Sequence, residues 1–218
     1  MKARQIRMDG DMVRATLDGR KTQIRPIVKD FDIVRVSDRT EFLSRSPYPL
    51  AKTDAGGTAY VELADRRFVG IPCPYGRPGD LLWVRETFAM DSPHIWYKAD
   101  CDDGPASDVC EYADTSYFEG VWKPSTHMPR WASRLTLKIT DVRVEQVQDI
   151  SNEDALAEGV GTPTDMRYAA LDAFRPLWDS IYEPQGFGWE VNPWVWVIEF
   201  EAHRMNVDKF IAAMEEAA

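Results

Sequence analysis

The sequence has few of the residues that build metal centres and disulfide frameworks. It contains three histidines and three cysteines, which are Cys73, Cys101 and Cys110. No two of these cysteines form a CxxC pair, whereas structural zinc sites need closely spaced Cys and His ligands. An odd number of cysteines also argues against a disulfide framework. We therefore expect free thiols, no metal site and no bound cofactor.

Long apolar runs are also missing. No stretch approaches the roughly 18 consecutive apolar residues that predict a transmembrane helix, and the first residues, MKARQIRMDGD, lack the apolar core of a signal peptide. A hydrophobic content of 44% with 11% aromatic residues nevertheless excludes a wholly disordered chain. We expect a soluble cytoplasmic protein without membrane contacts, folded as one large domain or as a small domain with insertions.

Basic residues are fewer than acidic residues, with 26 Lys and Arg against 36 Asp and Glu. The formal net charge of −10 argues against a protein that coats duplex DNA through a broad basic face. The charge is uneven, however, because residues 100–119 contain seven acidic residues and no Lys or Arg. Short basic stretches remain at residues 20–25, 66–67 and 130–134. A small basic site on an acidic protein is therefore still compatible with the composition.

The stretch from Asp9 to Pro26 predicts a helix followed by a cationic turn. Asp9 is a favourable N-cap, and Gly19 is suited to the left-handed conformation that ends a helix. The turn then holds three cations and a hydroxyl, namely Arg20, Lys21, Thr22 and Arg25. The spacing alone is compatible with a solvated basic turn and with a Lys-Thr site that faces a polar substrate.

Several strands are indicated by runs of apolar and aromatic residues. They cover residues 3–8, 31–36, 81–88, 95–99 and 194–200, and a hairpin is expected from Tyr60 to Val69. In the strand at 81–88, alternation places Arg85 and Glu86 on opposite faces. The two charges are either paired with neighbours or line a binding site. Near Asp141 the apolar alternation changes phase, as expected for a bulge in a sheet that curls into a barrel.

Helix signals follow in the second half of the chain. Ser151 is a favourable cap for a helix that Gly159 ends, and this places Glu158 in the last turn, where the helix dipole slightly disfavours a carboxylate. Residues 168–182 have helical spacing that Pro176 is expected to split or kink. Asn206 caps an amphipathic helix near the C-terminus.

One further stretch, VWKPSTHMPRWASR at residues 121–134, combines prolines, tryptophans and arginines. This composition suits a loop in which Arg130 and Trp131 face a ligand. It suits a structural loop held by tryptophan packing equally well.

Four of these stretches resemble, in their order, the ASCH domain, a member of the PUA-like β-barrel superfamily. They are the helix followed by GRKTQIRP, PGDLLWVRE at the start of a strand, SNEDALAEGV after a strand, and the closing strand WVWVIEF. The chain is also similar over nearly its whole length to ASCH-type proteins of tailed phages and prophages. The resemblance implies an α+β fold, a PUA-like barrel with flanking helices over residues 1–204. Insertions are expected at about 37–75 and 100–130, and an amphipathic helix at 205–218.

The resemblance also implies site residues. PUA-like barrels commonly bind RNA or single bases, one small bacterial ASCH enzyme is an amidohydrolase that acts on N4-acetylcytidine, and others are reported as ribonucleases. The residues of the amidohydrolase map to Lys21 and Glu158, whereas its Thr falls on Ile24 and the family's usual Arg falls on Pro26. Thr22 is the candidate to replace the missing hydroxyl, although an extended backbone would point it away from Lys21.

Three alternative functions follow from this resemblance. The first is hydrolysis of an N4-acylated cytidine-type substrate, with Lys21, Glu158 and Thr22 as catalytic residues. The second is non-catalytic binding of RNA, single-stranded nucleic acid or a modified nucleoside. The residues expected to bind the substrate are Arg20, Arg25, Arg85, Arg130 and Trp131. The third is an interaction with a phage or host protein, in the host cytoplasm. We expect Lys21 and Glu158 to meet in the fold, with Arg130 or Trp131 forming one wall of the site.

Overall fold

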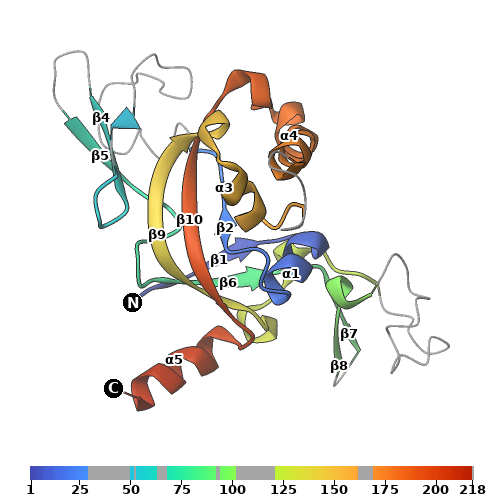
Figure 1. Cartoon of the computed structure of the whole chain (residues 1–218). Helices are drawn as coiled ribbons and strands as arrows, with labels where there is room; N and C mark the ends of the chain where they lie inside the picture. The colour runs from blue at the N-terminus through green and yellow to red at the C-terminus, as the bar shows by residue number, and fades with distance from the viewer. Residues whose placement is uncertain are drawn as a thin grey trace. The chain divides into compact units, whose positions relative to one another are not determined.

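The computed structural model describes residues 1–28, 50–51, 53–62, 68–91, 94–101, 121–161 and 169–217. The chain has a mixed α+β fold (Figure 1) and divides into two compact units, each assembled from separate segments. Unit 1 comprises Met1–Gly19, Leu81–Lys138 and Ala202–Ala218, and unit 2 comprises Arg20–Asp80 and Ile139–Glu201. In the described part of the chain, no helix is long and apolar enough to cross a membrane.

Unit 1 contains a mixed sheet with short helices. Its regular elements are β1 (Ala3–Arg7), α1 (Gly10–Leu17), β6 (Leu81–Arg85), β7 (Phe88–Asp91), β8 (His94–Tyr97), three 3-10 turns (Lys98–Asp100, Ser125–His127 and Arg130–Ala132) and α5 (Val207–Glu216). Strand β1 runs parallel to β6, and β6 runs antiparallel to the first residues of β9 (Thr136–Gln146). Strands β7 and β8 form an antiparallel hairpin. The predicted strands at 3–8, 81–88 and 95–99 are confirmed in outline.

The helices of unit 1 begin where their caps predict. The Asp9 side chain accepts a hydrogen bond of 2.8 Å from the Met12 amide, and Gly19 adopts a φ of 76° just after α1. Helix α5 is capped by Asn206. Its first residue, Val207, is fully buried against Leu81 and Trp83 of β6. The C-terminal amphipathic helix is therefore a packed part of unit 1.

Unit 2 contains the remaining elements. These are β2 (Gln23–Ile24), β3 (Leu50–Ala51), β4 (Thr58–Glu62), β5 (Phe68–Pro72), α3 (Asn152–Ala157), α4 (Ala169–Tyr182), most of β9, most of β10 (Trp194–His203), and 3-10 turns at Val147–Asp149, Glu183–Gln185 and Trp189–Val191. Strands β3, β4 and β5 form an antiparallel sheet, which confirms the hairpin predicted at Tyr60–Val69. All three strands lie within residues 37–75, where an insertion is expected. The strand predicted at 31–36 and most of the acidic stretch at 100–119 lie outside the described residues.

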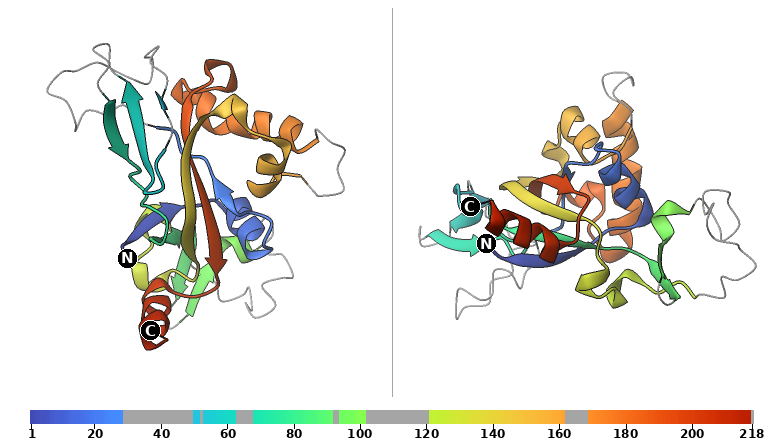
Figure 2. Two further views of the ribbon diagram at one scale, coloured as in Figure 1. Left: turned by 60° about the vertical axis from the view of Figure 1, so that its left-hand side comes forward. Right: turned by 90° about the horizontal axis from the view of Figure 1, so that it is seen from below.

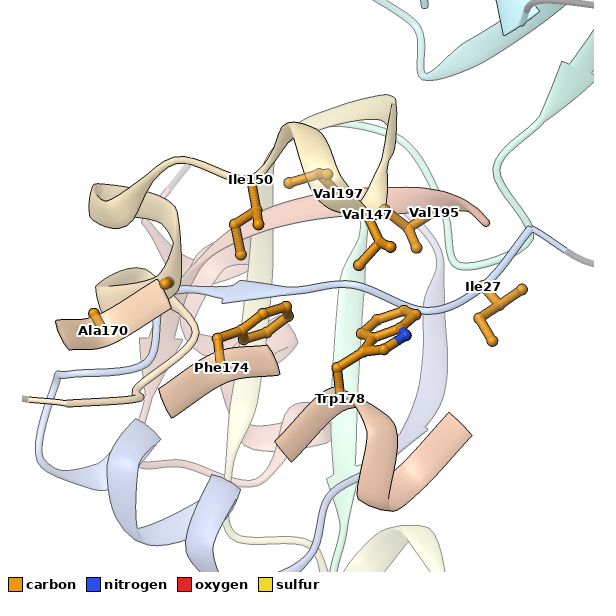
Figure 3. Packing of buried hydrophobic residues seen from close by; sticks show 9 residues of the cluster. Ile27, Val147, Ile150, Ala170, Phe174, Trp178, Val195 and Val197 are labelled. Atoms are coloured by element: carbon orange, nitrogen blue, oxygen red, sulfur yellow. The ribbon is translucent and has the colours of Figure 1, made fainter. Parts of the chain in front are cut away.

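The core of unit 2 explains why α3 and α4 cover β10. Val195 and Val197 of β10 are buried against Phe174 and Trp178 of α4 (Figure 3). The two helices lie next to each other in every view (Figures 1 and 2). Burial of large apolar side chains of this kind contributes about 1.5–3 kcal/mol each. This packing therefore fixes the position of α3 and of the residue that ends it, Glu158.

Of the two effects predicted for Pro176, a split or a kink, the split is not observed. Pro176 does not split the helical pattern, because a single helix runs from Ala169 to Tyr182 with Pro176 inside it. Pro176 is exposed, whereas Phe174 and Trp178 on either side of it are buried in the core. The packing of both turns outweighs the loss of one backbone hydrogen bond at the proline.

The predicted change in the alternation of apolar residues near Asp141 occurs in strand β9. Among the apolar residues of this strand, Leu137, Ile139 and Val142 are buried, so the buried apolar positions change from odd to even numbers at Thr140 and Asp141. The strand nevertheless continues without a break from Thr136 to Gln146. The strand pairings of the described residues do not include closure into a barrel.

Candidate functional site

The two residues that the resemblance singles out meet in unit 2. The backbone of Lys21 forms an antiparallel bridge with Glu158, and the amide of Thr22 donates a 2.7 Å hydrogen bond to the carbonyl of Ala157. The segment that follows α1 therefore runs beside the last turn of α3. Gly159 adopts a φ of 85° immediately after this turn, which ends α3 and leaves Glu158 as its C-cap residue.

The side chains of Lys21 and Glu158 form a buried ion pair. Lys21 Nζ donates to Glu158 Oε2 at 2.5 Å and to the backbone carbonyl oxygen of Glu158 at 3.0 Å. The exposed fractions of the two side chains are 1% and 8%. A buried ammonium group is strongly destabilising unless a partner compensates its charge. The structure thus brings Lys21 and Glu158 together, as expected from the sequence, although 137 positions separate them in the chain.

Arg25 binds the other oxygen of the same carboxylate. Its Nη1 atom donates to Glu158 Oε1 at 3.1 Å, and its side chain is only 2% exposed. Glu158 therefore lies between two buried cations, Lys21 and Arg25. The ammonium group of Lys21 has three N–H donors, and the described residues accept hydrogen bonds from two of them.

Alternation along the extended segment decides which neighbours join the site. Lys21, Gln23 and Arg25 all contact carboxylates of the same group, so they share one face of the segment. Thr22 and Ile24 belong to the opposite face: Thr22 is exposed, and Ile24 is buried within β2. Thr22 contacts the neighbouring strands through its backbone, accepting from the Phe200 amide at 2.9 Å.

Five further residues extend the ion pair into a network that we call the polar cluster. Gln23 Nε2 donates to Asp154 Oδ1 at 2.9 Å and to Glu199 Oε1 at 3.1 Å. Arg143 donates to Glu145 at 2.6 Å, to Glu199 at 2.5 Å and to Asp154 at 3.2 Å. The polar cluster consists of Lys21, Gln23, Arg25, Arg143, Glu145, Asp154, Glu158 and Glu199, so three cations face four carboxylates.

The charges of the cluster are stabilised by one another. Burial alone would raise the pKa of Asp154, but hydrogen bonds from Gln23 and Ser151 and the charge of Arg25 outweigh it, so the pKa lies below its ordinary value. Burial alone would lower the pKa of Arg143, but hydrogen bonds to Glu145 and Glu199 outweigh it and raise the pKa. Asp154 and Arg143 therefore remain charged throughout the neutral range.

A tyrosine of α4 lies in the electrostatic field of the ion pair. Burial, with smaller electrostatic contributions from Tyr75 and Glu158, raises the pKa of Tyr182 to about 12. The ring of Tyr182 packs against Trp178, with 4.2 Å between the ring centroids. Tyr182 is thus a neutral hydroxyl-bearing neighbour of the site at ordinary pH.

The remaining residues predicted to bind the substrate have other contacts. Arg20 Nη1 donates to the carbonyl of Gly159 at 3.0 Å, so Arg20 lies at the end of α3. Three more, Arg85, Arg130 and Trp131, belong to unit 1, whereas Lys21 and Glu158 belong to unit 2. A wall of the site formed by Arg130 or Trp131 therefore stays a prediction.

Within unit 1, these three residues differ in how they are held. Arg85 Nε donates to the carbonyl of Ser125 at 2.9 Å, and Arg130 pairs with Asp208 at 2.8 Å. Trp131 is 59% exposed. Both arginines are therefore engaged with the protein, and Trp131 is the residue of this group that presents a free surface.

The sequence analysis missed five members of the cluster. Gln23, Arg143, Glu145, Asp154 and Glu199 were not singled out, although two patterns point to them. Asp154 and Glu158 are four residues apart and therefore share a helix face. Arg143 and Glu145 are two residues apart and share a strand face. Neither pattern shows that the helix face and the strand face contact each other, because this contact depends on the packing of α3 on β10.

Comparison with known proteins adds no further assignment: no family model matches the chain, and no curated protein or solved structure matches it. In the described part of the chain, no group of three or more His, Cys, Asp and Glu side chains is arranged to hold a metal ion. The polar cluster and the ASCH resemblance are therefore the two features of this chain that point to a function.

Proposed function

We propose that this chain is an ASCH-type protein of the PUA-like superfamily that hydrolyses an acylated amino group on a nucleobase, such as that of N4-acylated cytidine. The observation that carries the proposal is the contact of 2.5 Å between Lys21 Nζ and Glu158 Oε2. These are the two catalytic residues that the resemblance assigns, and only the fold can bring them together. The buried pair places a cation and a carboxylate at one point, the two kinds of group that acid–base and electrostatic catalysis use.

The pair supplies the two functions that amide hydrolysis needs. Glu158 takes a proton from the attacking water, and the resulting hydroxide adds to the acyl carbon. The ammonium group of Lys21 stabilises the negative charge that develops on the acyl oxygen. When the C–N bond breaks, the proton passes from Glu158 to the leaving amine. The products are a carboxylic acid and the free exocyclic amine.

Arg25 has a supporting function in this mechanism. Because its Nη1 atom binds Glu158 Oε1, it holds the carboxylate in one orientation while Oε2 faces Lys21. Thr22 contributes no hydroxyl to this mechanism, since its side chain belongs to the opposite face of the segment. The proposed reaction therefore requires Lys21, Glu158 and Arg25, and no side-chain hydroxyl from the segment.

Hydrolysis of N4-acetylcytidine, followed by chromatography of cytidine and acetate, tests the proposal. We expect Lys21→Met and Glu158→Gln to lower kcat by about a hundredfold or more, the typical contribution of a general acid or base. Lys21→Arg keeps a cation opposite Glu158 and serves as a second variant if Lys21→Met folds poorly. Glu190→Gln removes an exposed ion pair with Arg175 in the same unit and is the matched control.

Two results would overturn the proposal. Wild-type protein that hydrolyses neither N4-acetylcytidine nor acylated cytosine in oligonucleotides excludes it. Activity of Lys21→Met equal to that of the wild type also excludes it, because the Lys21–Glu158 contact would then have no catalytic function.

The exposed side chain of Trp131 favours a second candidate, a non-catalytic module that binds single-stranded nucleic acid. Trp131 is 59% exposed, and stacking of a base on an aromatic side chain contributes about 1–3 kcal/mol. Titration of single-stranded RNA and DNA at low salt, followed by tryptophan fluorescence, tests this candidate. Trp131→Ala should weaken binding at least tenfold. Absence of binding at low salt would exclude it.

A further inference from the structure

The two ends of the Arg25 guanidinium group contact two carboxylates of the same helix. Its Nη1 atom donates to Glu158 Oε1 at 3.1 Å. Its Nη2 atom forms ion pairs with Asp154 Oδ1 at 3.3 Å and with Glu145 Oε2 at 4.0 Å, so Asp154 is the nearer partner. Asp154 is the third residue of α3 and Glu158 is its C-cap, and residues four apart share one face of a helix. One buried cation therefore connects the two ends of α3.

The shape of the guanidinium group makes these two contacts interdependent. Nη1 and Nη2 are both bonded to Cζ in one rigid plane. Rotation about the Nε–Cζ bond that took Nη2 away from Asp154 would also take Nη1 away from Glu158. A lysine at position 25 would keep the charge but would offer a single nitrogen. The contact with Asp154 therefore restrains the contact with Glu158.

Asp154 is itself held from several sides. Its Oδ1 atom accepts hydrogen bonds from Gln23 Nε2 at 2.9 Å and from Arg143 Nη2 at 3.2 Å. Its Oδ2 atom accepts from the Ser151 hydroxyl at 2.9 Å, in the capping box that begins α3. These partners belong to β2, to β9 and to the N-cap of α3. Asp154 is therefore a fixed anchor for Arg25, whereas an exposed carboxylate would be free to change its rotamer.

Neither the helix cap nor the charge balance explains why Oδ1 of Asp154 lies beside Arg25. The cap uses the other oxygen, Oδ2. Like charges four residues apart on a helix repel each other, so the charge of Asp154 is unfavourable for Glu158 taken alone. The cluster also has four carboxylates for three cations. The favourable contribution of Asp154 at this point is therefore to the position of Arg25.

We propose that Asp154 is a positioning residue that acts through Arg25 on Glu158. Asp154 Oδ1 holds Arg25 Nη2, and the rigid guanidinium group keeps Nη1 on Glu158 Oε1. The other oxygen, Oε2, is thereby kept 2.5 Å from Lys21 Nζ. A carboxylate that turned about its terminal bond would exchange its two oxygens, and a displacement of about 1 Å in a reacting group costs up to about a hundredfold in rate. Asp154 touches no substrate in this arrangement.

This inference rests on the function proposed above, because the orientation of Glu158 affects catalysis only if Glu158 takes a proton from the attacking water. One part of it is nevertheless measurable without hydrolysis, namely the rotation of the Arg25 guanidinium group about its Nε–Cζ bond. When both ends of the group are held, rotation is slow and the two Nη atoms give separate NMR signals. When one end is released, rotation is faster and the two signals merge.

Steady-state hydrolysis of N4-acetylcytidine tests the catalytic part, at a temperature at which circular dichroism shows each variant to be folded. Asp154→Asn keeps the size of the side chain and removes the charge that holds Arg25. It should lower kcat by about tenfold or more and leave KM within about twofold, because Asp154 does not touch the substrate. Glu153→Gln is the matched control, since it removes a charge from the exposed neighbouring residue on a different face of the same helix turn. It should keep kcat within about twofold of the wild type.

Arg25→Lys shows whether Asp154 acts through Arg25. It keeps the charge and removes the fork, so it should itself lower kcat by about tenfold or more, and it serves as the second variant if Asp154→Asn folds poorly. In the double variant, the change at Asp154 should lower kcat by no more than about a further twofold, because its effect depends on the same guanidinium group. A double variant with the product of the two single effects would show that Asp154 acts independently of Arg25, and would overturn the inference.

NMR spectra of isotope-labelled protein separate this inference from the proposed function. The Arg25 Nη signals are assigned by their absence from the spectrum of Arg25→Lys. They should be separate in the wild type and in Glu153→Gln, and they should merge in Asp154→Asn. This pattern supports the positioning of Arg25 even in a protein that does not hydrolyse N4-acetylcytidine, a result that excludes the proposed function. Merged signals in the wild type, separate signals in a folded Asp154→Asn variant, or an unchanged kcat of this variant in an active enzyme overturns the inference.

Discussion

Arg25 Nη1 lies 3.1 Å from Glu158 Oε1, on the carboxylate oxygen that Lys21 does not bind. Glu158 is therefore the shared anion of two buried cations, and the three charges are not equivalent. Removing Lys21 leaves Glu158 paired with Arg25. Removing the charge of Glu158 leaves two buried cations near each other without the anion that joins them.

This asymmetry predicts the relative stability of two variants. Glu158→Gln should lower the free energy of unfolding by about 3–5 kcal/mol, the cost of an uncompensated buried charge. Lys21→Met should cost less, about 1–3 kcal/mol, because the carboxylate keeps one partner. Urea denaturation of both variants measures the difference. A Lys21→Met variant that is less stable than Glu158→Gln would contradict the assignment of Glu158 as the shared anion.

The exposed pair between Arg175 and Glu190 provides the reference for this measurement. Their side chains are 53% and 79% exposed, and exposed ion pairs contribute about 0–1 kcal/mol. Glu190→Gln should therefore change the free energy of unfolding by less than about 1 kcal/mol. A larger effect would show that the difference between the two buried variants does not arise from burial.

The pKa of Asp154 predicts a pH dependence of stability. Its folded pKa lies below the unfolded value of 3.8, so Asp154 contributes stability that is present above the unfolded pKa and is lost as the pH falls through the folded pKa. The difference in stability between the wild type and Asp154→Asn should be constant above about pH 5 and should shrink below about pH 4. Urea denaturation between pH 3 and 7 tests this.

The helix cap does not obscure the result. Asp154 Oδ2 accepts a hydrogen bond of 2.9 Å from the Ser151 hydroxyl in a capping box, and Asn retains part of this function. The hydrogen bonds from Ser151 also lower the pKa of Asp154, so the cap and the contacts with Gln23 and Arg25 change the stability in the same direction as the pH falls. A difference that grows as the pH falls would contradict the direction of the pKa shift.

Local sequence signals were sufficient to place both ends of α1 and the starts of α3 and α5. Asp9, Gly19, Ser151 and Asn206 have capping geometries that depend on a few neighbouring residues, and the structure has each of them at the predicted helix end. Strands β1, β6 and β8 were indicated by short apolar runs for the same reason. Caps and runs of this kind are local, so they can be predicted from sequence.

Local signals do not show which faces of the strands and helices pack against one another. The meeting of Lys21 and Glu158 came from the resemblance, whereas Gln23, Arg143 and Glu199 joined the cluster through the packing of β2, β9 and β10. A polar residue on a strand has the same pattern whether it faces solvent or a carboxylate. The sequence therefore indicated the centre of the site and not the network that surrounds it.

Whether Pro176 splits a helix also depends on its tertiary context, which a local rule does not include. The proline lies within α4, where it cannot donate a hydrogen bond to the carbonyl of Asp172. Since its side chain is exposed, replacement does not disturb the core. Pro176→Ala should therefore raise the free energy of unfolding, by about 1–3 kcal/mol, after allowance for the greater entropy of the unfolded chain.

Thermal and urea denaturation of Pro176→Ala measure this gain. Leu177→Ala, at an adjacent position of α4 that is 41% exposed, is a control without a proline and should change stability little. Reduced stability of Pro176→Ala would show that the proline has a favourable function in the helix, for example by restricting the unfolded chain.

The last prediction concerns Ile24, which stands where the resembling amidohydrolase has its threonine. Ile24 is 6% exposed, lies opposite Ile198 in the pairing of β2 with β10, and belongs to the face of the segment that points away from Lys21 and Arg25. A hydroxyl at this position would be buried without reaching the ion pair. Ile24→Thr should therefore cost about 1–3 kcal/mol of stability and leave the rate of N4-acetylcytidine hydrolysis within about twofold of the wild type. Denaturation and steady-state kinetics of the same preparation measure both effects. A rate increase of tenfold or more would show that residue 24 reaches the substrate, and that the face assignment along residues 21–25 is wrong.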